Sequence, residues 1–233
     1  NYHFKINVLN VEAKLNGNGE SDFFYSDDTN IFMTSQEGRN SSILLFDTSG
    51  NILSRDIAKD FMHDSVFIDA AVDASGHLLV SNFDASLVGR PKQDPKIRPT
   101  YRISKYQMQG TNSQKILASR LAESQELTSK PGAIALSKTN NKLYVALPSE
   151  GRILKMDYVG GVFGRPEELI KGLSKPIKDI ALDAEGKFMY ITLGETVSMF
   201  KLTLNAEGDL DLTNSSFVQA MGNGNGHITI GQH

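Results

Sequence analysis

The sequence predicts an all-β protein, a β-propeller built from four-stranded antiparallel blades. Three observations support this fold: a short strand-turn-strand pattern occurs four times, the copies recur at similar intervals, and two further strand-like segments follow each copy. Units of four strands with a period in the forties are typical of propeller blades, which stack around an axis because one blade cannot bury both of its faces alone.

The four copies begin at Phe24, Ala71, Ala135 and Ala181, at intervals of 47, 64 and 46 residues. In each copy a polar turn with Asp, Asn or Gly joins two apolar segments, as expected because Gly and Asn accept the positive φ of tight hairpins. The second segment is the more apolar, as in "KLYVAL" and "FMYITL", which favours a strand covered on both faces. We therefore predict that Leu79, Tyr144 and Met189 are buried between blades and that the three alanines lie near the axis.

Later strands are expected from four "third" segments ("SILLFD", "YRISKY", "RILKMD" and "VSMFKL") and from four weaker fourth segments. These place the blades of a single domain (1–233) at about 22–57, 65–121, 132–173 and 177–214, with partial blades at 1–21 and 215–233. A fifth copy is expected to begin near His227, in "GHITIGQH". Two arrangements stay open: a segment of a six- or seven-bladed propeller, or a closed five-bladed ring completed by the terminal pieces.

The composition of the chain argues against several classes of function. The 233 residues include 24 basic and 27 acidic side chains, for a net charge of −3, and this balance argues against a general nucleic-acid binder. The sequence contains no cysteine, which excludes disulfides, Cys-zinc sites and thiol catalysis. It has no apolar run of the length of a transmembrane helix, so no membrane span is expected.

The repeated segments resemble the NHL and YVTN-like propeller repeats. The residues that carry this resemblance are Ala181 to Asp183 with Gly186, Lys142 to Ala146, and Arg152-Ile153. The resemblance implies the propeller architecture and leaves the activity open, because such propellers host many unrelated functions.

Acidic and amide side chains follow the second strands, on loops that should open on one face of the propeller. An acidic ring around the axis can hold a hard cation such as Ca²⁺, which prefers oxygen ligands; solvated loop charges are the alternative interpretation. No cofactor is predicted from these residues alone, but a bound metal would have the four carboxylates as ligands. The candidate binding residues are Glu37, Asn82, Asp84, Glu150 and Glu195.

An insertion at 85–100 interrupts the second copy on the same face. Prolines at every fourth position (Pro91, Pro95 and Pro99) should keep it extended and stiff. Long loops on rigid scaffolds often carry binding, so the loop predicts a protein partner with an acidic surface; a solvated connector is the alternative. Its candidate binding residues are Arg90, Lys92, Lys96 and Arg98, with Arg102 and Lys105 just beyond and Asp94 opposing them.

Histidines supply the acid-base candidates. His63 and Asp64 precede a first strand on this face and form the weak catalytic candidate. His77 belongs to the tight turn within a blade, where we expect it to be exposed.

The sequence thus favours a non-catalytic protein- or ligand-binding propeller module, because no catalytic constellation stands out. We expect it to be part of a larger exported or envelope-associated protein or assembly, outside the cytoplasm (periplasmic, secreted or cell-surface). The alternative is a lactonase-, lyase- or sugar-dehydrogenase-like propeller enzyme with a divalent metal on the axis.

Overall fold

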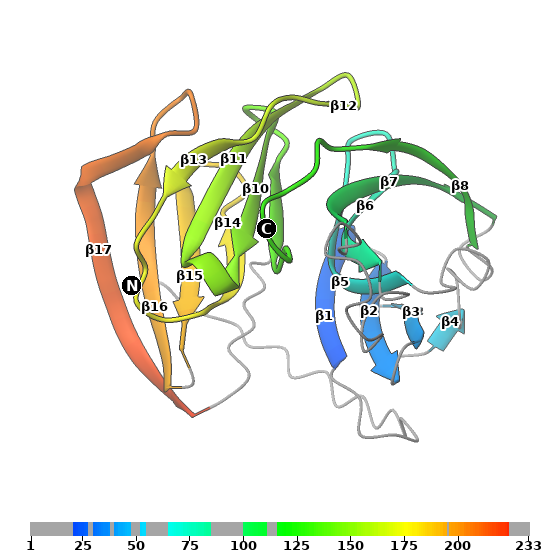
Figure 1. The fold of residues 1–233 in the computed structure, drawn as a ribbon, viewed down its shortest axis with the longest axis horizontal. Helices are drawn as coiled ribbons and strands as arrows, with labels where there is room; N and C mark the ends of the chain where they lie inside the picture. The colour runs from blue at the N-terminus through cyan, green and yellow to red at the C-terminus, as the bar shows by residue number, and fades with distance from the viewer. Residues whose placement is uncertain are drawn as a thin grey trace, which may run out of the picture.

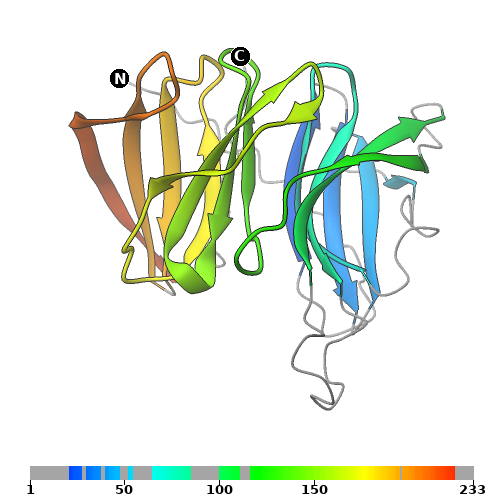
Figure 2. The same ribbon diagram turned by 45° about the horizontal axis from the view of Figure 1, so that its top comes forward.

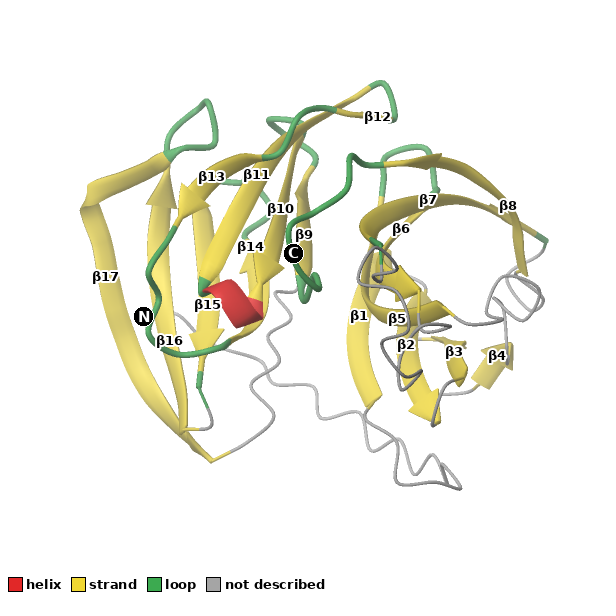
Figure 3. Cartoon of the chain, viewed as in Figure 1, coloured by secondary structure: helices red, strands yellow, loops and turns green. Residues whose placement is uncertain are grey.

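The computed structural model describes residues 21–27, 30–37, 40–47, 52–54, 65–84, 100–110, 116–194 and 196–223. The side-chain surroundings are described for 68–82, 100–110, 119–194 and 199–213. These parts of the chain are almost entirely β-structure, in four antiparallel sheets (Figure 1). Within them the one helical segment is a 3-10 turn, Pro148–Glu150 (Figure 3), so the predicted all-β propeller class is confirmed.

Each sheet is one blade, with its strands in chain order. The first blade consists of β1 (Ser21–Asp27), β2 (Asn30–Glu37), β3 (Asn40–Asp47) and β4 (Ile52–Ser54). The second consists of β5 (Ser65–Val72), β6 (Leu78–Asp84), β7 (Tyr101–Gln109) and β8 (Ile116–Glu123). The repeated pattern forms the first two strands of each blade.

The third and fourth blades follow the same plan with one variation. The third contains β9 (Ile134–Ser137), β10 (Lys142–Leu147) and β11 (Arg152–Val159), and its last strand is split into β12 (Val162–Phe163) and β13 (Glu167–Ile170), which both pair with β11. The fourth contains β14 (Ile177–Leu182), β15 (Phe188–Leu193), β16 (Thr196–Leu204) and β17 (Leu210–Asn223). The last strand therefore continues beyond 214, the predicted end of this blade.

The first strands of successive blades lie next to one another. β1 contacts β5, β5 contacts β9, and β9 contacts β14, and the sheets follow in this order across the molecule (Figures 1 and 2). This arrangement around the first strands is that of a propeller.

The core lies between the blades, and β10 shows why its sequence is continuously apolar. Leu143 and Val145 pack with Leu79 and Ile103 of the second blade. Tyr144 and Ala146 lie on the other side of the strand and pack with residues of the fourth blade that include Met189 and Ile191. Leu79, Tyr144 and Met189 are all fully buried, which confirms the prediction for the second strands.

Three of the turns that follow first or third strands have the same local structure. The backbone N–H of Gly76, Gly186 and Gly208 donates to the carbonyl oxygen three residues earlier, of Asp73, Asp183 and Asn205. Each of these glycines has a positive φ, between 68° and 79°, which explains the glycine. Figure 2 shows the turns gathered at the upper end of the sheets, so the connections between second and third strands lie at the opposite end.

One further finding concerns membranes. Among the described residues, no helix is long and apolar enough to cross a bilayer.

The buried second strands give a stability prediction. Replacing Leu79 or Met189 by Ala should lower the free energy of unfolding by about 2–5 kcal/mol, because a cavity remains between two blades. Denaturant unfolding would measure this. The control is Leu212→Ala on the 77% exposed Leu212, which should change stability by less than about 0.5 kcal/mol. Equal effects of all three substitutions would contradict the assignment of the core.

Candidate functional site

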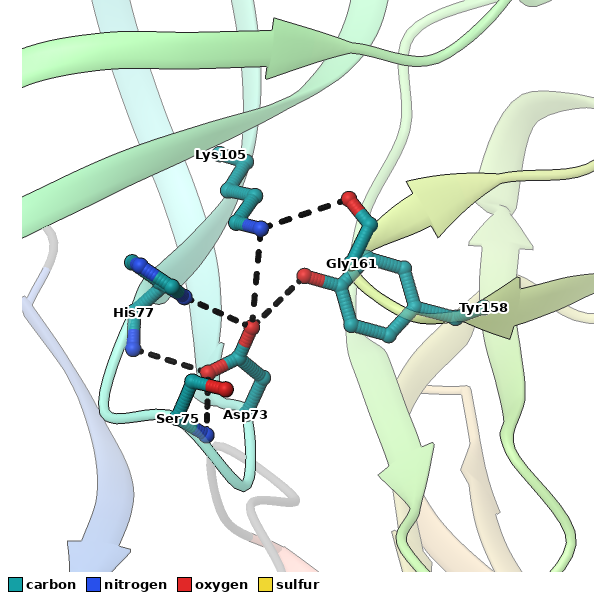
Figure 4. A network of polar contacts seen from close by, with 6 residues as sticks. All are labelled: Asp73, Ser75, His77, Lys105, Tyr158 and Gly161. Atoms are coloured by element: carbon teal, nitrogen blue, oxygen red, sulfur yellow. Dashed lines mark hydrogen bonds and ion pairs between the residues drawn. The ribbon is translucent and has the colours of Figure 1, made fainter.

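A buried carboxylate lies at the boundary between the second and third blades. Asp73 directly follows β5, the first strand of the second blade, and is 6% exposed. Its Oδ1 accepts hydrogen bonds from the backbone N–H groups of Ser75 (2.9 Å) and His77 (2.8 Å) (Figure 4). These two bonds fix the carboxylate within its own turn, as Asp side chains commonly do at such positions.

The second oxygen of Asp73 is directed at donors from other strands. The hydroxyl of Tyr158, in β11 of the third blade, donates to Oδ2 at 2.7 Å. Nδ1 of His77 lies 3.1 Å from the same oxygen, and Nζ of Lys105, in β7, lies 3.9 Å away. Groups from two blades therefore meet on one oxygen atom.

Lys105 makes a second contact across the boundary. Its Nζ donates to the carbonyl oxygen of Gly161 at 3.3 Å and lies 5.9 Å from the ring centre of Tyr158. Gly161 belongs to the tight turn between β11 and β12, and a Cβ at this position would come within 2.3 Å of Nζ. The positive φ of 79° favours glycine here, and a side chain at this position would also displace the Lys105 ammonium group from its partners. Asp73, Ser75, His77, Lys105, Tyr158 and Gly161 form what we call the Asp73 network.

The protonation states follow from these contacts. Burial alone would raise the pKa of Asp73, but the hydrogen bonds from Tyr158 and from the side chain and backbone of His77 outweigh it and hold the pKa below its usual value. Burial and the neighbouring Asp73 carboxylate raise the pKa of the Tyr158 hydroxyl far above its usual value. At neutral pH Asp73 is therefore an ionised acceptor and Tyr158 a protonated donor, an arrangement that links two blades.

The boundary between the third and fourth blades uses the same kind of link. Lys155 of β11 holds the position in its blade that Lys105 holds in the second, because Lys105 is paired with Leu79 and Lys155 with Tyr144, both in second strands. Its Nζ forms an ion pair with Asp209 and approaches the carbonyl oxygen of Glu207 at 3.5 Å. In both cases the lysine reaches the turn after the third strand of the next blade.

Two of the candidate binding residues that follow the second strands have described side chains, Asn82 and, from the predicted acidic ring, Glu150. Asn82, in β6, is buried, and its Oδ1 accepts a hydrogen bond from the Ser104 hydroxyl at 3.0 Å. Glu150 lies in the 3-10 turn and pairs with Arg152 at 2.6 Å. Burial alone would raise the pKa of Glu150, but its hydrogen bonds and the positive charge of Arg152 have the larger, opposite effect. The pKa of Glu150 therefore lies below its usual value.

These two residues do not fit a shared metal site. The amide oxygen of Asn82 is already an acceptor, and Arg152, which also pairs with Glu168 at 3.0 Å, neutralises Glu150. Among the described side chains no group of three or more His, Asp or Glu residues is arranged to hold a metal ion. Glu37 and Asp84 end β2 and β6, with side chains outside the described ones. The other candidates lie outside the described residues: His63, Asp64, Arg90, Lys92, Lys96, Arg98 and Glu195.

Two expectations from the sequence require correction. His77 is not freely exposed, because its side chain is only 24% accessible and contacts Asp73. Lys105, counted with the basic insertion, is instead buried in the Asp73 network, and Arg102 lies 3.6 Å from Glu123. The sequence missed Asp73, Lys105 and Tyr158 as site residues, although the lysine shared by "YRISKY", "RILKMD" and "VSMFKL" is a signal that could have found one of them.

Comparisons with known proteins identify the fold. No family model and no curated protein matches the chain. Similar solved structures include a gluconolactonase of Xanthomonas campestris (TM-score 0.50, 15% identity, 82% of this chain and 60% of that one). A second is a putative 6-phosphogluconolactonase of Bacteroides uniformis (TM-score 0.52, 14% identity, 84% of this chain and 56% of that one). A third is a nidogen/laminin complex (TM-score 0.52, 16% identity, 85% of this chain and 64% of that one). The chain spans about 60% of the length of these proteins, and the likeness shows the β-propeller fold, as the resemblance to NHL and YVTN-like repeats predicted.

The Asp73 network predicts a measurable coupling between blades. Tyr158→Phe removes one donor from a buried carboxylate, so the free energy of unfolding should fall by about 1–3 kcal/mol. In an Asp73→Ala background, which removes both acceptor oxygens, the same substitution should cost much less. Tyr144→Phe, which removes the hydrogen bond from Tyr144 to the Gly208 carbonyl at 3.1 Å, is the control and should cost the same in both backgrounds. Additive effects of Asp73 and Tyr158 would contradict the link.

The lowered pKa of Asp73 predicts a pH dependence. A carboxyl with a folded-state pKa below its unfolded value stabilises the protein above the unfolded pKa, which is near 4, and this contribution is lost as the pH falls through the folded pKa. The stability difference between wild type and Asp73→Asn should therefore be constant near neutral pH and narrow below about pH 4. Urea unfolding from pH 7 to pH 2.5 measures it. A difference that widens in acid would reverse the sign and refute the assignment.

Proposed function

We propose that the chain is a non-catalytic protein-binding propeller module whose binding element is the basic loop, residues 85–100. The observation that carries the proposal is the unequal length of otherwise equivalent connections. The links between second and third strands occupy residues 38–39, 148–151 and 194–195 in the first, third and fourth blades. In the second blade the same link occupies 85–100.

The loop is anchored in a rigid part of the molecule. It leaves β6 and returns in β7, whose ends are paired through Phe83 and Tyr101. Ile103, two residues into β7, is fully buried, and Lys105 is bound in the Asp73 network. A rigid base lowers the entropy that a binding loop loses when it meets its partner.

The chemistry of the loop favours an acidic protein surface. With Lys105 buried and Arg102 beside Glu123, the charges that remain for a partner are those of Arg90, Lys92, Lys96 and Arg98, against Asp94. A role in protein association is supported by one of the similar structures, because that structure is a complex of two proteins, nidogen and laminin. The proposal places the module in a larger extracytoplasmic protein or assembly.

Hydrolysis of a lactone with a divalent metal such as Ca²⁺ is the second candidate. Two similar structures, the gluconolactonase and the putative 6-phosphogluconolactonase, favour lactone hydrolysis by their names, whereas the metal is suggested by the acidic side chains of this sequence. Asn82 and Glu150 are engaged elsewhere, so a metal would need Glu37, Asp84 and Glu195. Ca²⁺-dependent release of acid from gluconolactone, abolished by Asp84→Asn, would favour this candidate over the binding module.

Binding to an acidic polypeptide tests the favoured proposal. Immobilised poly-L-glutamate is the probe, and the variant replaces Arg90, Lys92, Lys96 and Arg98 by Ser. We expect at least about tenfold weaker binding with an unchanged melting temperature, and a steep fall of wild-type binding with salt, because exposed charges are screened beyond about 8 Å at physiological ionic strength.

The control removes four exposed positive charges elsewhere. Lys138, Arg165, Lys175 and Lys178 are all exposed, and their replacement by Ser changes the net charge equally. Equal loss of binding in both variants would show that only the net charge matters and would reject the loop as the binding element. Binding unaffected by the loop substitutions and by salt would reject the proposal altogether.

A further inference from the structure

We propose that Arg102 and Arg120, positioned by Glu123, bind a carboxylate of the acidic partner at the base of the basic loop. The occupant is an Asp or Glu side chain of that partner, in the place beside Arg102 that Glu150 has beside Arg152 in the third blade. The inference rests on the proposed function, because it concerns the same partner, and it adds the binding residues that lie outside the loop.

Arg102 in the second blade corresponds to Arg152 in the third. Lys105 and Lys155 hold equivalent positions in the third strands of these blades, and each of these lysines is preceded, three residues earlier, by an arginine. Both arginines lie at the start of the third strand. There the chain returns from the connection that follows the second strand.

The carboxylate that faces each arginine is equivalent as well. Glu123 of β8 pairs with Ser104, and Glu168 of β13 pairs with Leu154. Ser104 and Leu154 each directly precede one of the two equivalent lysines. The arginine lies 3.6 Å from Glu123 in the second blade and 3.0 Å from Glu168 in the third. In both blades an arginine of the third strand therefore meets a glutamate of the last strand.

In the third blade the positive charge of the arginine is compensated. Arg152 pairs with Glu150 at 2.6 Å and with Glu168 at 3.0 Å. Lys171 pairs with Glu168 at 3.3 Å, so two carboxylates face two positive groups. Glu150 belongs to the connection between the second and third strands, which means that one of the two carboxylates comes from the segment just before the arginine.

In the second blade the charge balance is positive. Arg102 and Arg120 both face Glu123, at 3.6 and 2.8 Å, so two guanidinium groups share one carboxylate and keep a net charge of +1. Their side chains are 36% and 53% exposed, and a guanidinium group carries five N–H donors. A carboxylate from outside can therefore take the place that Glu150 has in the third blade.

A β-bulge brings Arg120 to this carboxylate. Arg120 and Glu123 are three residues apart, so in a regular strand their side chains would point to opposite faces of the sheet. The pairing of β8 with β7 shifts at Leu121, because the residues on either side of it pair with the adjacent Lys105 and Tyr106. The extra residue turns Arg120 to the face of Glu123, although it leaves Leu121 46% exposed.

Glu123 is fixed by its surroundings. The buried Ser104 hydroxyl, which donates to Asn82, lies 3.5 Å from Oε1 of Glu123. The next residue, Ser124, exchanges hydrogen bonds with the backbone of Ile103 through its N–H and its hydroxyl, at 2.9 and 3.0 Å. A fixed carboxylate orients both guanidinium groups before the partner arrives, which lowers the entropy lost on binding. Glu123 is thus a positioning residue, and the two arginines are the binding residues.

The arginine pair lies where the basic loop returns to the sheet. Arg102 is the second residue after the loop, about 7 Å along an extended strand, so one acidic partner can reach both. Arginine suits this place because its planar guanidinium group binds a carboxylate through two parallel N–H···O bonds, whereas lysine offers a single point charge.

Replacing both arginines by lysine separates this inference from the proposed function. Arg102→Lys combined with Arg120→Lys keeps every positive charge and leaves the loop unchanged. Binding to immobilised poly-L-glutamate should weaken at least about fivefold, because lysine cannot form the paired bonds. Arg165→Lys, at an exposed arginine of the third blade, is the control and should bind as the wild type does.

Glu123→Ala is a second test, in which charge and position predict opposite results. Removal of a carboxylate raises the net charge by one unit, so charge alone would strengthen binding to poly-L-glutamate. Loss of the positioning residue should instead weaken it at least about twofold. The matched control is Glu185→Ala, which removes a carboxylate paired with Lys187 at 2.6 Å and should not weaken binding.

The two proposals fail in different ways. Unchanged binding of the double lysine variant, with binding lost in the loop variant, would overturn the inference and leave the loop as the binding element. Weaker binding of the double lysine variant, with the loop variant binding as the wild type does, would support the arginine pair and reject the loop. Tighter binding of Glu123→Ala than of the wild type would show that charge alone acts here and would also overturn the inference.

Discussion

The contact on which the described structure most depends is the meeting of Asp73, Tyr158 and Lys105 across a blade boundary. A buried carboxylate is costly unless donors and a positive charge compensate it, and here the compensating groups come from both blades. The second blade therefore depends on the third for the Tyr158 donor that compensates the burial of the ionised Asp73. The relative position of the two sheets is therefore fixed by charge and hydrogen bonding in addition to apolar packing.

A link from a buried lysine to a turn of the next blade recurs at the following boundary, although the carboxylate there is 53% exposed. At the following boundary Lys155 supplies the positive charge and Asp209 the carboxylate, while burial raises the pKa of Tyr144 to about 12 and keeps it a donor to the Gly208 carbonyl. The lysine position is common to both boundaries, whereas its acceptor lies in a turn whose sequence varies from blade to blade. Successive repeats can thus share the lysine of this contact while the acceptor in the next blade differs.

The sequence predicted the features that depend on local chemistry. The four hairpins followed from turn residues and alternating apolar positions, and the burial of Leu79, Tyr144 and Met189 followed from a strand that is apolar on both sides. It did not predict that Tyr158 donates to Asp73, because the two are 85 residues apart and meet only when blades stack. It also placed Lys105 with the solvent-exposed charges of the neighbouring basic loop, because the lysine that recurs in three of the third strands was not used as a signal.

For this reason, insertions in the connecting loops should have different consequences at the two ends of the blades. The turns after the first and third strands supply Asp73, Gly161 and Asp209 to the boundaries, so an insertion there would displace a buried charge from its partner. Residues 148–151, the connection after a second strand that the structure describes throughout, take no part in these links, and the connection at 85–100 in the second blade follows a second strand as well. The long connection of the second blade therefore lies at the end of the sheet away from the described contacts that hold the blades together.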